Sequence, residues 1–201
     1  MTVTDAGTHP LNRREVVRTL TADRQGTVFI SSLGSPTYDL AAAGDSARNF
    51  YLWGAMGGAM SLGLGLALAR RDVAVCVLAG DGEILMGMGS FATIAQQAPS
   101  NLAVVILDNG LYGETGEQRS HTASGTDLCR VARACGIENS ITVRTLPELA
   151  DLAQRLHADD PAGPLVARVL IAPGPERTCL PSRDGVWLAR RLQQDLGVKG
   201  L

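Results

Sequence analysis

The sequence predicts an α/β fold, in which a doubly wound, mostly parallel sheet carries helices on both faces. Two unbroken runs of six apolar residues, Val73–Leu78 and Leu102–Leu107, are typical of parallel strands that are covered on both sides. Between them, Ile84–Ala98 is long enough for a helix, and further strands and helices alternate along the rest of the chain. We expect residues 1–10 to form a flexible arm and residues 11–201 to form a single domain, which suits a chain of 201 residues.

The remaining elements follow from local patterns. From Leu11 the apolar spacing is helical, and Asn12 is a candidate N-cap for that helix. Thr27–Ile30 is a short β-branched and aromatic run that predicts a buried strand before a turn-prone segment at Ser31–Pro36. The other predicted elements are helices at Thr126–Ala134, Leu146–His157 and about Val186–Leu196, and strands at Ile141–Val143 and Leu165–Ile171.

One segment, Leu52–Ala69, contains 18 residues without a charge and so reaches the length of a membrane-spanning helix. Its five glycines make a poor lipid-facing surface, and the flanking α/β pattern favours a buried helix instead. Its small residues would let another backbone or a ligand approach closely, within this chain or across a subunit interface, and for Gly57, Gly58, Gly63 and Gly65 we expect close packing at a subunit interface.

Composition excludes several classes of function. The formal charge of −2 and the lack of basic runs argue against a nucleic-acid surface. The single lysine, Lys199, leaves no suitable residue for a lysine-dependent phosphate loop or a pyridoxal Schiff base. The four cysteines form no C-x-x-C pair and the Met1–Pro10 segment is polar, so we expect free thiols and a cytoplasmic location.

The strongest chemical signal follows the strand Val73–Leu78, in the sequence Gly80-Asp81-Gly82-Glu83. The two glycines permit a sharp turn and let phosphate oxygens approach the backbone, while the following helix N-terminus favours an anion. An aspartate at this point would repel phosphate unless a cation such as Mg²⁺ lay between them. Asn109 follows the next predicted strand, so its side chain is expected at the same edge of the sheet.

These residues resemble the diphosphate-binding domain of thiamine diphosphate (ThDP)-dependent enzymes, whose motif begins with GDG and ends with an asparagine. The resemblance implies ThDP and Mg²⁺ as cofactors. It implies that the Asp81 carboxylate, the Asn109 side chain and the Leu111 carbonyl hold Mg²⁺ against the diphosphate, with Gly80 and Gly82 beside them.

A second stretch, Leu52-Trp53-Gly54-Ala55-Met56-Gly57, resembles the segment that meets the aminopyrimidine ring in this family. By that resemblance the Gly54 carbonyl would accept from the 4′-amino group and Met56 would hold the cofactor in its bent shape. Ser35 matches a position that touches the diphosphate.

The resemblance narrows on Leu33-Gly34-Ser35-Pro36, Phe91–Pro99 and the loop Leu107–Thr122 (LDNGLYGETGEQRSHT). Together these are similar to the β subunits and C-terminal halves of sulfopyruvate and phosphonopyruvate decarboxylases, over roughly Leu11–Gly174. The similarity implies a decarboxylase acting on a small anionic 2-oxo acid. The tail beyond Gly174 does not match the family clearly.

Three further residues have open roles. Glu83 stands where the family more often has a small residue, so it either faces the diphosphate or points to solvent. His121 is the candidate catalytic residue, as a proton donor or as a ligand for the substrate's anionic group alongside Arg119, unless it is a loop histidine bonded to backbone. Tyr112 is expected either to form a wall of the cofactor site or to serve in packing.

The family protonates the pyrimidine with a glutamate from a separate pyrimidine-binding domain, for which this chain has no room. We therefore expect a hetero-oligomer in which an α subunit supplies that glutamate, and a chain that is inactive alone. Two alternatives remain: a ThDP-dependent carboligase similar to acetolactate synthase, and a non-catalytic nucleotide-binding module of Rossmann type. The latter is disfavoured because no G-x-G-x-x-G follows the first strand.

Overall fold

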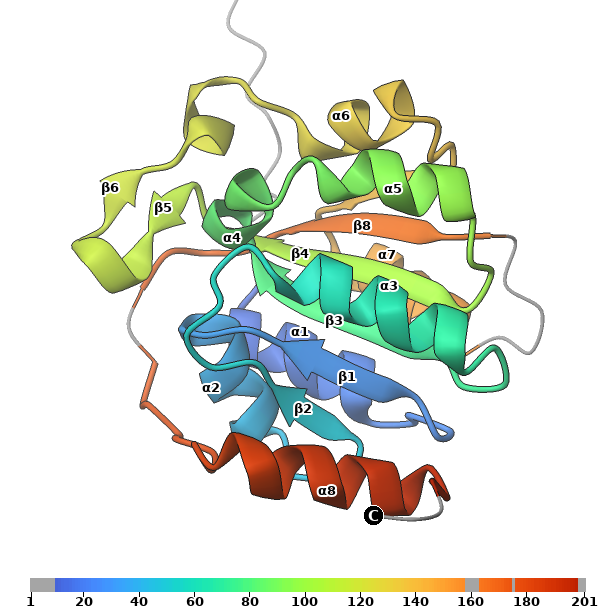
Figure 1. The fold of residues 1–201 in the computed structure, drawn as a ribbon. Coiled ribbons are helices and arrows are strands. Elements are labelled where there is room, and N and C mark those ends of the chain that lie inside the picture. Colours follow the sequence, from blue (N-terminus) through green and yellow to red (C-terminus); the bar gives the residue numbers. More distant parts are fainter. Residues whose placement is uncertain (1–9, 158–162, 175, 199–201) are drawn as a thin grey trace, which may run out of the picture.

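The computed structural model describes residues 10–157, 163–174 and 176–198, and its path through the fold is drawn in Figure 1. The predicted arm lies almost wholly outside the described residues, as do His9 and Lys199. The chain forms one sheet of six parallel strands in the order β2-β1-β3-β4-β8-β7 and a separate two-stranded ribbon, β5-β6. The strands are β1 (Val28–Ser31), β2 (Asn49–Tyr51), β3 (Val75–Gly80), β4 (Leu102–Asp108), β5 (Leu111–Tyr112), β6 (Gln118–Arg119), β7 (Ser140–Val143) and β8 (Leu165–Leu170).

Helices cover both faces of the large sheet, which confirms the predicted doubly wound α/β fold (Figure 1). One face packs against α3 (Ala59–Ala69), α4 (Asp81–Met86), α5 (Ser90–Gln97) and α6 (Leu128–Ala134). The other face packs against α1 (Arg13–Thr21), α2 (Ser35–Ala42) and α7 (Leu146–Leu156). Alternate residues of the central strands enter the two cores: Val75 and Val77 face one layer, whereas Cys76 and Leu78 face the other.

The predicted helix at Ile84–Ala98 is wrong in its bounds, because the structure divides it into α4 and α5. The break falls where the chain passes Gly57: a Cβ atom on Gly87 would lie only 2.2 Å from the Gly57 carbonyl oxygen. A helix continuing through this point with ordinary side chains would collide with that backbone. The helix also begins earlier than predicted, at Asp81 within the GDG turn.

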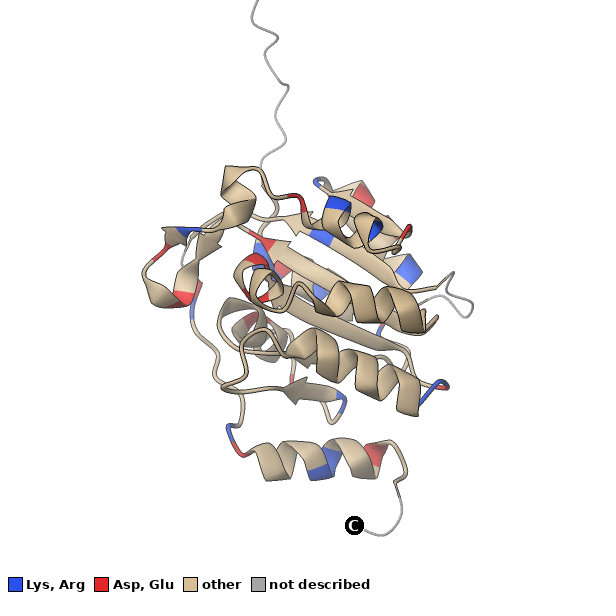
Figure 2. Cartoon of the chain, turned by 45° about the horizontal axis from the view of Figure 1, so that its top comes forward, with Lys and Arg blue, Asp and Glu red and all other residues tan. Residues whose placement is uncertain are grey.

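Leu52–Ala69 is helical only from Ala59 onward, because Gly54 and Gly57 adopt φ of 76° and 89° and keep the preceding residues in a loop. Gly63 packs within this chain, where a Cβ would lie 2.3 Å from Val77 Cγ2 of β3, so the predicted subunit interface is not its reason. Across the described residues, no helix is long and apolar enough to cross a membrane. Figure 2 shows that α3 and α5 carry no charged residue.

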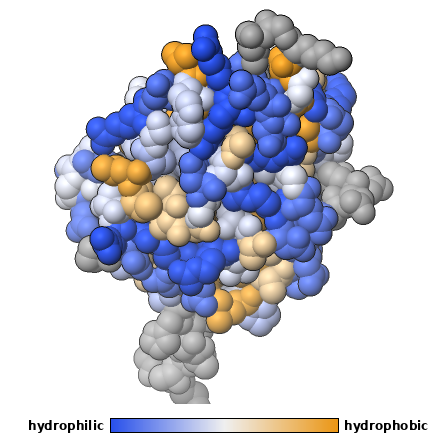
Figure 3. Space-filling model, turned by 90° about the horizontal axis from the view of Figure 1, so that it is seen from below, coloured by the Kyte–Doolittle hydropathy of each residue, from blue (hydrophilic) through white to orange (hydrophobic). Residues whose placement is uncertain are grey.

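The C-terminal helix α8 (Gly185–Asp195) lies beside the edge strand β2, at the opposite side of the sheet from β7 (Figure 1). Arg191 forms an ion pair with Asp45 at 2.6 Å, and Arg48 forms one with Asp195, also at 2.6 Å. Seen from below in Figure 3, the surface is mostly hydrophilic with separate apolar patches. Because α8 packs beside β2 and Arg191 donates to the Asn49 carbonyl, this helix shields a sheet edge that would otherwise expose unpaired backbone groups.

Candidate cofactor-binding site

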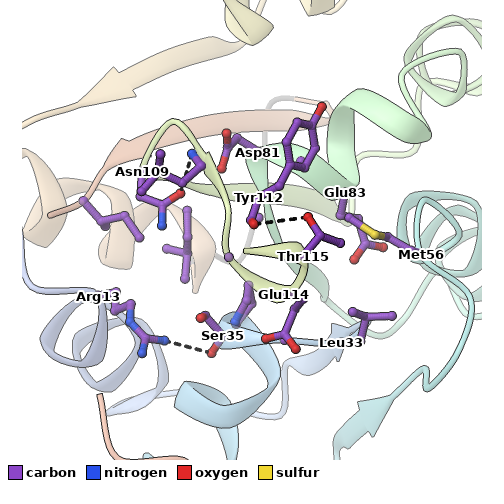
Figure 4. Close-up of a pocket in the computed structure, with 18 residues that line it drawn as sticks. Arg13, Leu33, Ser35, Met56, Asp81, Glu83, Asn109, Tyr112, Glu114 and Thr115 are labelled. Carbon is purple, nitrogen blue, oxygen red and sulfur yellow. Dashed lines mark hydrogen bonds between the residues drawn. The ribbon is translucent and has the colours of Figure 1, made fainter. Parts of the chain in front are cut away.

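The carboxyl edge of the sheet opens into a crevice between β1 and β3, where the chain changes direction. α2 follows β1 onto one face of the sheet and α4 follows β3 onto the other, so the two connections diverge. Such a switch point is where open α/β sheets bind ligands. The pocket found there is drawn in Figure 4. Its lining comes from the ends of β1, β3, β4 and β8 with the residues that follow them, from α1, from the loop before α3, and from β5 with the short helix after it: Arg13, Leu33, Gly34, Ser35, Pro36, Met56, Gly80, Asp81, Gly82, Glu83, Leu107, Asn109, Leu111, Tyr112, Gly113, Glu114, Thr115 and Ile171.

Asp81 lies at the first residue of α4 and is 2% exposed. Its Oδ2 accepts hydrogen bonds from the hydroxyls of Ser120 and Thr122, which return to it from the end of the long loop after β4. Burial has the largest effect on the pKa of Asp81; although the hydrogen bond from Ser120 lowers this pKa, burial and the charge of Asp108 raise it above its ordinary value. A bound cation would offset both effects, so this carboxylate suits a metal ligand.

Asn109 lies across the pocket from Met56 and Glu83, directly after β4 (Figure 4). Its Oδ1 accepts from the Leu111 N–H at 3.0 Å, so the side chain and the Leu111 backbone form one compact turn at the pocket wall. An amide oxygen has a second lone pair, which leaves Asn109 one position for a further ligand. The positive φ of 71° at Gly110 permits this turn.

Tyr112 packs its ring against the GDG turn. A Cβ on Gly82 would lie 2.5 Å from Tyr112 Cδ1, so only glycine fits beneath that ring. Tyr112 therefore lines the pocket and also packs against the turn that carries Asp81. Its hydroxyl lies 3.2 Å from Nδ1 of His121.

The side chain of Glu83 does not point to solvent; it lines the pocket but is bonded to backbone groups of the neighbouring segment. The side chain is 5% exposed, and its Oε1 accepts from the backbone N–H groups of Gly57 and Ala59, each at 3.3 Å. Ala59 is the first residue of α3 and Gly57 directly precedes its N-cap, Gly58, so the carboxylate lies at the helix N-terminus, where it also interacts favourably with the helix dipole. Burial raises the pKa of Glu83. The residue thus joins the GDG turn to the segment that carries Met56.

Ser35 lies at the first residue of α2, and the guanidinium of Arg13 reaches its carbonyl oxygen at 3.4 Å (Figure 4). Arg13 also donates to Asp39 at 2.7 Å, and Asp39 is fully buried. On the same side of the pocket, the Glu114 side chain lies against Gly34. This wall therefore contains both a cation and a carboxylate.

Of the remaining predicted site residues, some line the pocket and others do not. Met56, Gly80 and Leu111 line it, whereas Gly54 is exposed on the loop before Met56 and lines no part of it. His121 is exposed and does not line the pocket of this chain.

Several residues at the site were missed by sequence reasoning. Arg13 had a visible signal, because it occupies the apolar face of its helix together with Val16, Val17 and Leu20. A charge in that position indicates a buried partner. Ser120 and Thr122 gave no such signal, because their partner Asp81 is 39 and 41 residues away in the sequence.

The groups at this edge fit a divalent cation beside a diphosphate. The buried carboxylate and the amide oxygen suit the cation, and the glycine-framed turn at the first turn of a helix suits the diphosphate. This combination defines an α/β domain that binds a phosphorylated cofactor at its topological switch point.

Comparison with known proteins gives the family. Residues 34–166 match the family described as thiamine pyrophosphate enzyme, C-terminal TPP binding domain, and the chain belongs to it. Thiamine pyrophosphate is another name for ThDP. The GDG turn, Asn109 and Met56 all lie within the matched part.

Among curated relatives, the sulfopyruvate decarboxylase subunit beta of Methanothermobacter thermautotrophicus is 40% identical over 164 residues, which cover 82% of this chain and 84% of that protein. The protein of the same name from Methanocaldococcus jannaschii is 46% identical over 121 residues, or 60% of this chain and 63% of that protein. A phosphonopyruvate decarboxylase of Streptomyces viridochromogenes is 39% identical over 72% of this chain, but the match spans only 36% of its length.

Among solved structures, a 2-oxoglutarate:ferredoxin oxidoreductase from Magnetococcus marinus superposes with a TM-score of 0.66 and 19% identity, over 93% of this chain and 70% of that one. This structural similarity supports the assignment of a doubly wound α/β fold.

Proposed function

We propose that this chain is the ThDP- and Mg²⁺-binding subunit of a two-subunit decarboxylase that converts a small anionic 2-oxo acid, of the sulfopyruvate or phosphonopyruvate type, to an aldehyde and CO₂. The observation that carries the proposal is the pocket at the β1–β3 switch point, where Asp81 and Asn109 lie together. The names of the relatives support the reaction class.

In this function the residues of the chain bind and orient. Asp81, Asn109 and the Leu111 carbonyl would hold Mg²⁺ against the diphosphate, with Ser35 and the Gly80–Gly82 turn beside it. Met56 would support the centre of the cofactor, and the Tyr112 ring, which packs against Gly82, would help to exclude water from the turn at Asp81. When bound, ThDP supplies the nucleophilic carbon and the electron sink that decarboxylation requires.

The site of this chain is open on the side of Met56. Gly54, whose carbonyl is proposed to meet the aminopyrimidine, is exposed, and so is Met86 at the end of α4, with 62% of its surface accessible. A pyrimidine-binding α subunit that carries the glutamate is proposed to cover this side. The designation of two relatives as subunit beta supports a hetero-oligomer. His121 and Arg119 stay candidates for contact with the substrate's anionic group, in a site that the partner completes.

The test is to purify the chain alone and with its partner, and to measure ThDP binding by calorimetry and CO₂ and aldehyde release from sulfopyruvate, phosphonopyruvate and pyruvate. We expect Mg²⁺-dependent ThDP binding, and turnover of an anionic substrate only by the complex. Full turnover by the chain alone would refute the two-subunit part, and an acyloin product in place of the aldehyde would favour a carboligase. Failure to bind ThDP under any condition would refute the proposal as a whole.

A further inference from the structure

The hydroxyl groups of Ser120 and Thr122 both form hydrogen bonds to the carboxylate of Asp81. Ser120 Oγ and Thr122 Oγ1 lie 2.8 Å from each other, and both reach the same oxygen, Oδ2, the Thr122 contact measuring 3.0 Å. Ser120 and Thr122 are 1% and 8% exposed, so water does not compete for these contacts. His121, between them, faces outward toward Tyr112.

The same hydroxyl of Thr122 also joins a second carboxylate. Thr122 Oγ1 lies 2.8 Å from Oδ1 of Asp108, the last residue of β4. Oδ2 of Asp108 accepts from Arg168 at 2.5 Å, and its Oδ1 also accepts from the Gly110 N–H at 2.9 Å. Arg168 therefore compensates part of the charge of Asp108 from the far side, and Thr122 can share its single proton between the two carboxylates.

As a result, the two oxygens of Asp81 are not equivalent. Oδ2 is occupied by both hydroxyls, whereas within the described part of the chain no other side chain donates to Oδ1. The carboxylate is also held against rotation, because the backbone of the loop is fixed by the Ser120 N–H bond to the Gly110 carbonyl at 2.8 Å. Asp81, which lines the pocket, thus keeps one oxygen, Oδ1, without a side-chain donor among the described residues.

We propose that Ser120 and Thr122 are positioning residues that set the cation preference of the site by leaving Asp81 a single ligating oxygen. Mg²⁺ requires a compact octahedral shell and suits one-oxygen carboxylate ligation, whereas Ca²⁺ accepts more oxygens and takes both oxygens of a carboxylate. With Oδ2 occupied, the site disfavours Ca²⁺. This inference rests on the proposed function, in which Asp81 is the carboxylate ligand.

The experiment compares full-length wild type with Ser120→Ala, Thr122→Val and the double variant. Mg²⁺ or Ca²⁺ is titrated in the presence of ThDP, and binding is followed by calorimetry. Removal of supporting hydrogen bonds around a metal ligand costs about 10- to 100-fold in metal affinity. We expect a loss of that size for Mg²⁺ and little or none for Ca²⁺, so that the Mg²⁺/Ca²⁺ preference falls about tenfold or more. Thr122→Ser, which keeps the hydroxyl, should restore the wild-type preference.

Ser124→Ala serves as the control, because Ser124 is exposed in the same short helix, η2 (His121–Ser124). Melting curves without cofactor identify variants that fail to fold, and the Thr122→Val and Thr122→Ser pair then decides the question. Equal losses for Mg²⁺ and Ca²⁺, or an unchanged preference, would overturn the inference and leave the proposed function standing. If the wild-type chain binds ThDP equally well without a divalent cation, the proposed metal site is wrong, and this inference fails with it.

Discussion

Replacement of Glu83 by alanine provides a direct test of how the two halves of the pocket are connected. The carboxylate of Glu83 accepts from the Gly57 and Ala59 N–H groups at 3.3 Å each, and its removal leaves those two donors without an acceptor. A hydrogen bond to a charged group contributes about 1.5–3 kcal/mol, and two contacts of this length belong to the lower end of that range, about 3 kcal/mol for the pair. The expected loss is about 1–2 kcal/mol, because relief of the buried charge offsets part of the cost.

The measurements are thermal unfolding and ThDP calorimetry. For a domain of this size, about 1–2 kcal/mol lowers Tm by roughly 2–8 °C. Because the loosened segment carries Met56, ThDP affinity should fall about five- to tenfold. Glu83→Gln keeps an acceptor oxygen and should lose less than half as much stability. Glu138→Ala, which removes an exposed carboxylate, should change neither quantity. If Glu83→Ala melts and binds ThDP as wild type does, the link between the GDG turn and α3 has no energetic role.

Three further changes are predicted from the structure. Gly82→Ala places a Cβ 2.5 Å from the Tyr112 ring, so the ring must move and ThDP affinity should fall about tenfold or more by calorimetry; unchanged affinity would show that the ring contact is dispensable. Glu148 accepts from the backbone N–H groups of the two residues before α7, which lowers the pKa of its carboxyl. Its stabilisation is therefore present above the unfolded pKa of about 4.3 and lost as pH falls through the lower folded value, so the difference in Tm between wild type and Glu148→Gln should be full at pH 7 and shrink as pH falls below about 4.3. Met86→Lys adds a charge beside the open side of the pocket and should weaken assembly with the partner in sedimentation experiments, whereas Leu146→Lys, equally an exposed apolar residue but on α7, should not.

The parts of the fold that sequence reasoning found are those in which the local pattern and the tertiary environment agree. The runs at Val73–Leu78 and Leu102–Leu107 became β3 and β4, because the centre of a parallel sheet requires continuous apolar residues. α2 was missed because Ser35 and Pro36 resemble a turn, although proline is also well suited to a first helical turn. β2 has only three residues at the sheet edge, too few for a period to be visible.

The same reasoning explains which parts of the site could be predicted. Asp81 and Asn109 follow strands, and the parallel order of the strands brings such positions to one edge without further information. The contacts that hold them depend on the path of loops, which no local pattern encodes. Glu83 is the clearest example: its neighbours suggested the diphosphate or solvent, whereas the structure directs it to α3, which begins 24 residues earlier.

The C-terminal segment, which the family resemblance does not cover, supports the same pocket from outside. The indole N–H of Trp53 donates to the Ser182 carbonyl at 2.8 Å, and the Arg183 guanidinium lies 5.2 Å from the Trp53 ring. Trp53 directly precedes Gly54, so the segment holds the start of the loop that ends at Met56. α8 then fixes the segment to the sheet edge through Arg191 and its two hydrogen bonds to Asp45. Because one end of this loop is held by the tail and the other by Glu83, its exposed middle, Gly54 and Ala55, is the part beside the pocket that the proposed partner could contact.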